Sequence, residues 1–153
     1  AKLPIHNGAI FHYTHSSNNT IMIEKLLQLD ANIVNHRTGG CTPLIVYCYK
    51  MRDYGIKKYF SLMQLVYKYG ANINAFDNFG DSIVSICAGR NHLDELKIIV
   101  EEWGASLTKP TSSTDDLELE HIKKWKDPLA EAKHWKCVDT TKYLEEVYQQ
   151  RNI

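Results

Sequence analysis

Gly40-Cys41-Thr42-Pro43-Leu44 is the stretch that decides the fold of this chain, together with Gly70-Ala71-Asn72-Ile73-Asn74 thirty residues later. Thr before Pro predicts a helix start, because the Thr hydroxyl can accept from free backbone N–H groups while Pro takes the first helical position without wasting a donor. Gly70 follows an apolar stretch, and a glycine at positive φ ends a helix without a Cβ clash. The residues between these signals therefore predict two helices joined by a turn.

The same pattern recurs in register along the chain. Asp30-Ala31-Asn32 and Gly104-Ala105-Ser106 match Gly70-Ala71-Asn72, and ten residues separate both Asp30 from Gly40 and Gly70 from Gly80. A helix-opening stretch precedes each triplet, at residues 7–12, 40–45 and 80–85. The distances from opening to triplet are 23, 30 and 24 residues, so the middle copy carries an insertion of about seven residues.

The pattern resembles the ankyrin repeat, a β-turn plus two antiparallel helices with the signature T-P-L-H-x-A followed by G-A-x-x-N. The resemblance implies an all-α solenoid of about four stacked helix-turn-helix units with short β-turn fingers, in a single domain spanning residues 1–153. The units are expected at residues 3–37, 38–77, 78–108 and, as a degenerate C-terminal cap, 117–153. In the cap, Asp127-Pro128-Leu129-Ala130-Glu131-Ala132 imitates the signature. We expect the chain to be a fragment of a longer protein.

The chain departs from the family signature at the histidine. In the family, the Thr and His of the tetrapeptide hydrogen-bond to each other, yet Ile45, Ser85 and Ala130 replace that His, while His12 stands opposite Ala9. No unit keeps both partners. The sequence therefore predicts an array that is less stable than one built of consensus repeats.

Composition narrows the class of partner. The formal net charge is zero, which disfavours nucleic acid and anionic membranes as partners. No apolar run approaches the roughly 20 residues of a spanning helix. The four cysteines, at 41, 48, 87 and 137, form no C-x-x-C pair and are interpreted as reduced packing residues. No cofactor or metal is expected.

The insertion of the second unit, residues 47–60, is both aromatic and basic. In repeat arrays, insertions map to loops on one face, often the binding face, and Tyr and Arg often dominate interface energies. The alternative is that the tyrosines extend the first helix and pack. The partner-binding candidates from this segment are Tyr47, Tyr49, Arg52, Tyr54, Lys57 and Lys58.

The turn fingers supply a second set of candidates, because recognition in the ankyrin family uses the fingers and the first helices. Phe76 and Phe79 are large apolar groups near a turn tip, where desolvation by a partner is favourable. Packing against adjoining fingers is the alternative for both. The finger candidates are His36, Arg37, Phe76, Asn78, Phe79 and Asp81.

Enzymatic patterns are sparse. Phosphate-loop, dinucleotide-binding, nucleophile-elbow and zincin motifs are all missing from the sequence. His12 and His15 share a helical face, but a structural role is favoured over a metal site. Cys137 and His134 are the alternative hypothesis, a small cysteine-dependent hydrolase, although no orienting third group accompanies them. We therefore expect no catalysis by this fragment and a role in binding another protein.

A narrower resemblance concerns source and partner. The richness in Asn, Ile, Lys and Tyr, the diverged repeats and the look of a C-terminal fragment are similar to ankyrin domains of bacterial type III effectors, notably the OspC group. In that group an upstream ADP-ribosyl-type transferase domain modifies arginine on host inflammatory caspases, and the ankyrin part recruits the caspase. This implies a host caspase as partner and secretion into the host cytosol. An ankyrin scaffold of a viral or eukaryotic protein, located in the cytoplasm, is the alternative.

Overall fold

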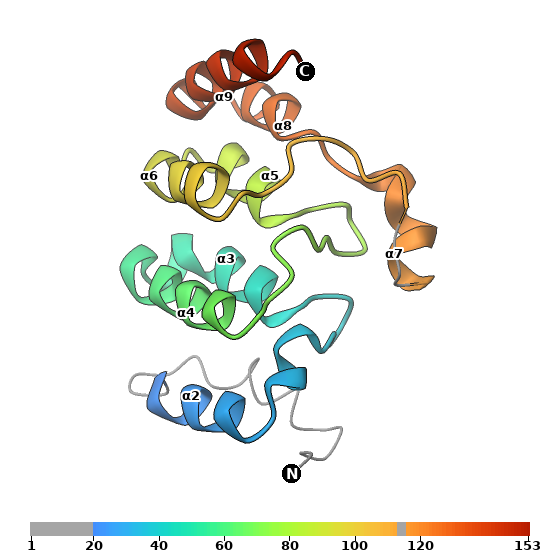
Figure 1. Cartoon of the computed structure of the whole chain (residues 1–153). Coiled ribbons are helices and arrows are strands. Elements are labelled where there is room, and N and C mark those ends of the chain that lie inside the picture. The colour runs from blue at the N-terminus through green and yellow to red at the C-terminus, as the bar shows by residue number, and fades with distance from the viewer. Residues whose placement is uncertain (1–19, 113–115) are drawn as a thin grey trace. The chain divides into compact units, whose positions relative to one another are not determined.

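The computed structural model describes residues 20–112 and 116–153, with side chains left out at 116–118. These residues form helices joined by turns, and no strand occurs among them (Figure 1). The all-α prediction is confirmed at this level. The chain divides into two compact units, Ala1–Asn72 and Ile73–Ile153, here called the N-terminal and C-terminal units. Within the described ranges, no helix is both long and apolar enough to cross a bilayer.

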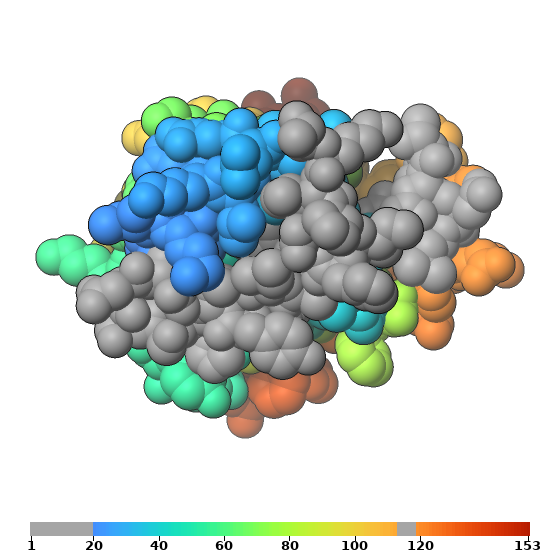
Figure 2. All heavy atoms as spheres, turned by 90° about the horizontal axis from the view of Figure 1, so that it is seen from below, coloured from blue at the N-terminus to red at the C-terminus, as the bar shows by residue number. Residues whose placement is uncertain are grey.

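The N-terminal unit contains α2 (Thr20–Leu29), the 3-10 helix η1 (Ala31–Asn35), α3 (Pro43–Tyr54) and α4 (Ile56–Lys68). The predicted first helix of the first repeat lies outside the described residues. Figure 2 shows α2, in blue, at the surface of this unit, where Ile21, Met22 and Leu29 are exposed while Ile23 and Leu27 are buried. Helix α3 begins after Thr42 with Pro43 in its first turn, which confirms the predicted helix start.

The insertion of the second repeat lengthens two helices and forms no loop. Only Gly55 separates α3 from α4, at φ 123°, a backbone angle that glycine adopts without a Cβ clash. The loop expected for this segment is therefore wrong, and the alternative of helix extension is confirmed. The physical reason is burial: Tyr47 and Met51, four residues apart on α3, and Tyr59 on α4 are all fully buried.

The C-terminal unit contains two helix pairs. The first is α5 (Ile83–Gly89) with α6 (Leu93–Lys97), which continues as the π-helix η2 (Ile98–Glu102); the second is α8 (Pro128–His134) with α9 (Val138–Arg151). Helix α5 packs against α8, and α6 packs against α9 (Figure 1). The first helices of the two pairs therefore pack on each other, and so do the second helices. Their fully buried side chains include Leu96, Ile99, Ala132 and Leu144. Helix α8 begins within Asp127–Ala132, the segment that imitates the repeat signature, and α8 and α9 both lie within the expected cap.

A short linker helix precedes the last pair. It consists of α7 (Asp116–His121) and the 3-10 turn η3 (Ile122–Lys124), at the start of the expected cap. Asp127 then caps α8, its side chain accepting from the backbone N–H of Ala130 at 2.8 Å. The cap explains why the chain turns into a helix again at this point.

Two tight turns stand where the fingers are expected. An isolated antiparallel bridge joins Thr38 to Cys41 in the N-terminal unit, and another joins Phe76 to Ser82 in the C-terminal unit. Each is too short to form a strand. They bring the chain from the end of one helix pair to the start of the next helix.

An asparagine side chain makes the same kind of contact in both units. In the N-terminal unit, Asn35 accepts from the backbone N–H of Asn72 at 2.7 Å and donates to the carbonyl of Gly70 at 3.2 Å. In the C-terminal unit, Asn74 accepts from the backbone N–H of Ser106 at 2.8 Å. Asn72 and Ser106 are the third residues of the matching triplets that define the sequence repeat. The contact therefore recurs in step with the repeat.

Candidate protein-binding surfaces

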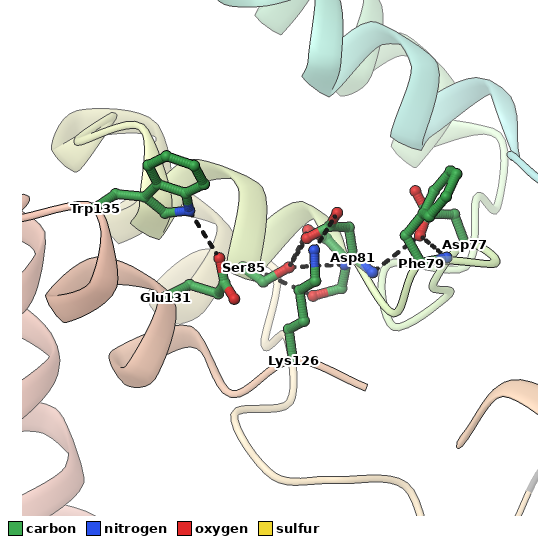
Figure 3. Close-up of polar contacts among 8 residues, drawn as sticks. Asp77, Phe79, Asp81, Ser85, Lys126, Glu131 and Trp135 are labelled. Carbon is green, nitrogen blue, oxygen red and sulfur yellow. Dashed lines mark hydrogen bonds and ion pairs between the residues drawn. The ribbon is translucent and has the colours of Figure 1, made fainter. Parts of the chain in front are cut away.

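The first candidate surface is the finger of the C-terminal unit, residues 77–81, which is organised around the buried side chain of Asp77. Its Oδ1 accepts from the backbone N–H groups of Phe79 and Asp81, both at 2.9 Å (Figure 3). The backbone closes the same turn, because Asp77 N–H donates to the Asp81 carbonyl at 2.9 Å and Gly80 N–H donates to the Asp77 carbonyl at 3.1 Å. A single buried carboxylate thus fixes the conformation of the finger.

The linker after η3 holds the other side of the finger. Lys126 Nζ lies 3.0 Å from Asp81 Oδ2, and Ser85 Oγ donates to Asp81 Oδ1 at 3.3 Å (Figure 3). Burial alone lowers the pKa of Lys126, but the hydrogen bond and the charge of Asp81 outweigh it and leave that pKa raised. The backbone approaches equally closely: Lys126 N–H donates to the Gly80 carbonyl at 3.0 Å.

Gly80 is required at this crossing. Its φ is +85°, and a Cβ at this position would overlap the carbonyl of Lys124. Glycine is the residue that permits both the backbone angle and the close approach. The finger is therefore clamped between Asp77 on one side and the 124–126 backbone on the other.

The clamped finger separates the two phenylalanines proposed from sequence. Phe76 is buried, only 2% exposed, so the packing alternative holds for it, and its side chain is not available to a partner. Phe79 is 72% exposed. Asn78 is half-buried, and Asp81 is engaged by Lys126 and Ser85. The finger thus presents one large apolar side chain to solvent on a fixed backbone.

The finger of the N-terminal unit exposes fewer side chains that a partner could contact. His36 and Arg37 are both half-buried. The Arg37 guanidinium donates to the carbonyl of Gly40 at 2.9 Å, inside the turn that Thr38 and Cys41 close. Arg37 therefore stabilises its own turn, and this turn carries no exposed aromatic residue.

The second candidate surface lies where α3 meets α4, and three tyrosine rings form its base. The fully buried Tyr47 ring lies 6.2 Å from that of Tyr59, and the Tyr59 ring lies 6.4 Å from that of Tyr54 in an edge-to-face arrangement. Tyr54 is 63% exposed. Tyr47 was expected to touch a partner, but its burial makes it a core residue. The rings run from core to surface and fix the position of Tyr54.

Basic side chains surround Tyr54. Lys50 Nζ lies 5.0 Å from the Tyr54 ring centre, and Lys58 Nζ lies 5.5 Å from that of Tyr59, both within cation–π range. Arg52 pairs with Asp53 at 3.2 Å, with both side chains more than half exposed. We call this surface the aromatic–basic corner and define it as Tyr49, Lys50, Arg52, Tyr54, Lys57 and Lys58. All but the half-buried Tyr49 and Lys50 are exposed.

Two contributors were missed from sequence. Lys50 lies within the insertion, four residues before Tyr54, and this helical spacing was the signal that could have identified it. Lys126 lies 45 residues from Asp81, and no local pattern links them.

The alternative catalytic pair does not assemble. The thiol of Cys137 lies 3.9 Å from the carbonyl of Trp135, and the ring of His134 stacks edge-on against Trp135 at 4.9 Å. In the described part of the chain, Cys137 and His134 make no hydrogen bond to each other, and no group of three or more metal-ligating side chains gathers. His12 and His15 lie outside the described residues.

No protein-family model, no curated protein and no solved structure matches this chain. The resemblance to ankyrin repeats therefore rests on the residues of the chain and on the recurring geometry described above.

Proposed function

We propose that this chain is an ankyrin-type module that binds another protein. Three features support the proposal: the register of the triplets, the stacking of α5–α6 on α8–α9, and the asparagine contacts at Asn35 and Asn74. A unit of about 33 residues cannot bury its own apolar face, so such units stack and present an extended surface, suited to holding a protein.

The observation that carries the proposal is the exposed Phe79 on its clamped finger. Moving a phenylalanine side chain from water into an apolar interface is favourable by about 1.5–3 kcal/mol. The exposed Phe79 side chain can gain this free energy only when a partner covers it. Because Asp77 and the Gly80–Lys126 backbone contact already fix the turn, a partner covering Phe79 pays little ordering entropy. An exposed aromatic group on a rigid turn has the properties of an interface anchor.

The test is capture of partner proteins by the chain with and without the aromatic tip. Phe79→Ala is compared with Val138→Ala, which removes another highly exposed apolar side chain of the same unit, 76% exposed at the start of α9. Captured proteins are identified by mass spectrometry from a host-cell lysate. We expect Phe79→Ala to lose proteins that the wild type and Val138→Ala both retain. Identical capture by all three would contradict the proposal.

The narrower resemblance to OspC effectors names a partner class to include in this test. Under that hypothesis an inflammatory caspase is among the proteins lost with Phe79→Ala, and purified caspase binds the wild-type chain directly. If other proteins are captured and no caspase is among them, the protein-binding proposal is retained and the effector hypothesis is contradicted.

A further inference from the structure

The zero net charge of the chain conceals two oppositely charged halves. Residues 1–72 carry eight Lys and Arg against three Asp and Glu, a formal charge of +5. Residues 73–153 carry ten against fifteen, a formal charge of −5. A field that cancels at long range is therefore strong close to each unit, within a Debye length of about 8 Å at physiological salt.

The positive charge of the N-terminal unit concentrates at the aromatic–basic corner. Lys50, Arg52, Lys57 and Lys58 fall within nine residues, and Asp53 is the one acidic residue among them. With Asp53 counted, residues 49–58 therefore have a formal charge of +3 around the exposed ring of Tyr54.

Helix stability does not account for all of this charge. Lys50 and Arg52 lie near the C-terminal end of α3, where the helix dipole favours cations. Lys57 and Lys58 lie in the first turn of α4, where the helix dipole disfavours cations. The dipole of α4 therefore gives no reason for two lysines at this position.

We propose that the aromatic–basic corner binds an acidic segment of the partner protein, with carboxylates against the four basic side chains and an apolar side chain on the Tyr54 ring. The inference deepens the proposed binding function by giving the chemistry of the partner. A short acidic segment fits better than a nucleic acid or a membrane, because the chain as a whole has no net charge with which to attract an extended polyanion.

The experiment measures binding of a fluorescein-labelled peptide of glutamate and phenylalanine to the whole chain by fluorescence anisotropy. A lysine–phenylalanine peptide is the probe control. Lys57→Glu with Lys58→Glu is expected to weaken binding about tenfold, and Tyr54→Ala by a similar factor, since charged pairs and a central aromatic each contribute at an interface. Lys25→Glu is the matched control, because Lys25 is an exposed lysine of the same unit on α2. It is expected to change affinity less than twofold.

Affinity for the acidic peptide is also expected to fall as salt rises. The proposal is overturned if the acidic peptide does not bind, if the lysine peptide binds equally well, or if Lys25→Glu weakens binding as much as the corner variants. Tighter binding to single-stranded DNA or to phosphatidylserine vesicles would overturn it too. Its failure can be distinguished from failure of the proposed function. If the peptide does not bind but capture still depends on Phe79, only the proposal about the corner is contradicted. If the peptide binds but capture does not depend on Phe79, only the proposal about the finger is contradicted.

Discussion

At the scale of single residues, Thr42 and Ser82 occupy equivalent positions, each immediately before the first helix of a repeat, and they are satisfied differently. Ser82 and Ser85 form a reciprocal capping box, with N–H to Oγ distances of 3.3 and 2.9 Å. Thr42 is buried, and its hydroxyl has no hydrogen-bond partner in residues 20–112 and 116–153. Ile45, three residues after Thr42 as Ser85 is after Ser82, has no polar group to offer this hydroxyl. The serine pair therefore satisfies the start of α5, and no equivalent pair exists at the start of α3.

This difference predicts opposite effects of two similar substitutions. Thr42→Val removes a buried unsatisfied hydroxyl at nearly constant volume and is expected to raise the free energy of unfolding by about 1 kcal/mol. Ser82→Ala removes a working cap and is expected to lower it by about 1 kcal/mol. Urea unfolding followed by circular dichroism measures both. Equal losses in the two variants would show that Thr42 does cap its helix.

At this scale the sequence indicates which residues are candidates for binding, but it does not determine whether each side chain is buried or exposed. Phe76 and Phe79 are three residues apart on one turn, and both alternatives, packing and exposure, applied to each. The structure assigns one to the core and one to solvent because Asp77 turns the backbone between them. Such an assignment depends on hydrogen bonds of the turn, and residue type alone does not encode it.

At the scale of elements, the helix pairs are tied together by side chains from α9. The Tyr148 hydroxyl donates to Asp127 Oδ1 at 2.9 Å, at the start of α8, and the Tyr143 hydroxyl donates to Glu101 at 2.9 Å, in η2. Burial raises the pKa of Tyr148, and the charge of Asp127 and the hydrogen bond to it act in the same direction. Burial, followed by the hydrogen bond to Glu101, likewise raises the pKa of Tyr143.

These ties predict alkaline unfolding of the C-terminal unit. The folded pKa of Tyr148 lies above the unfolded value of 10.0, so its contribution is complete below pH 10 and is lost as pH rises from there toward the folded pKa. One such group gives a slope of at most about 1.4 kcal/mol per pH unit. Tyr148→Phe is expected to reduce the slope of unfolding free energy above pH 10, with Tyr143 and Lys126, whose pKa values are also raised, contributing to the remaining slope.

Tryptophan fluorescence measures this slope for the C-terminal unit alone, because Trp103, Trp125 and Trp135 are the only three tryptophans of the chain. An unchanged slope in Tyr148→Phe would show that its hydroxyl does not couple α8 to α9.

The helix boundaries were predictable because local residues mark them: proline at a helix start, an acidic cap and glycine at a helix end. The lengths of α3 and α4 were not predictable from such local residues. The insertion is interpreted as a loop when it is compared with a repeat of fixed length, whereas the buried Tyr47 and Met51 have the i, i+4 spacing of a helix. The periodicity of the apolar side chains was the better guide.

At the scale of the whole molecule, the overall composition does not show that charge is unevenly distributed along the chain. A net charge of zero disfavours nucleic acid and anionic membranes as partners, and it leaves out of view that the two units carry +5 and −5. The repeat register was visible in sequence because the triplets recur at regular spacing. The contact between Lys126 and the finger could not be predicted, since the two residues are 45 apart in the sequence and no local pattern links them.

The central claim, that one structural repeat is built in succession along the chain, predicts that Asn35 and Asn74 play equivalent roles. Asn72 and Ser106 are exposed residues whose backbone N–H groups donate to these two side chains. Amide hydrogen exchange by NMR tests this most directly. We predict protection of both amides in the wild type, loss at Asn72 alone in Asn35→Ala, and loss at Ser106 alone in Asn74→Ala. Unprotected amides in the wild type, or variants that leave protection unchanged, would contradict the claim.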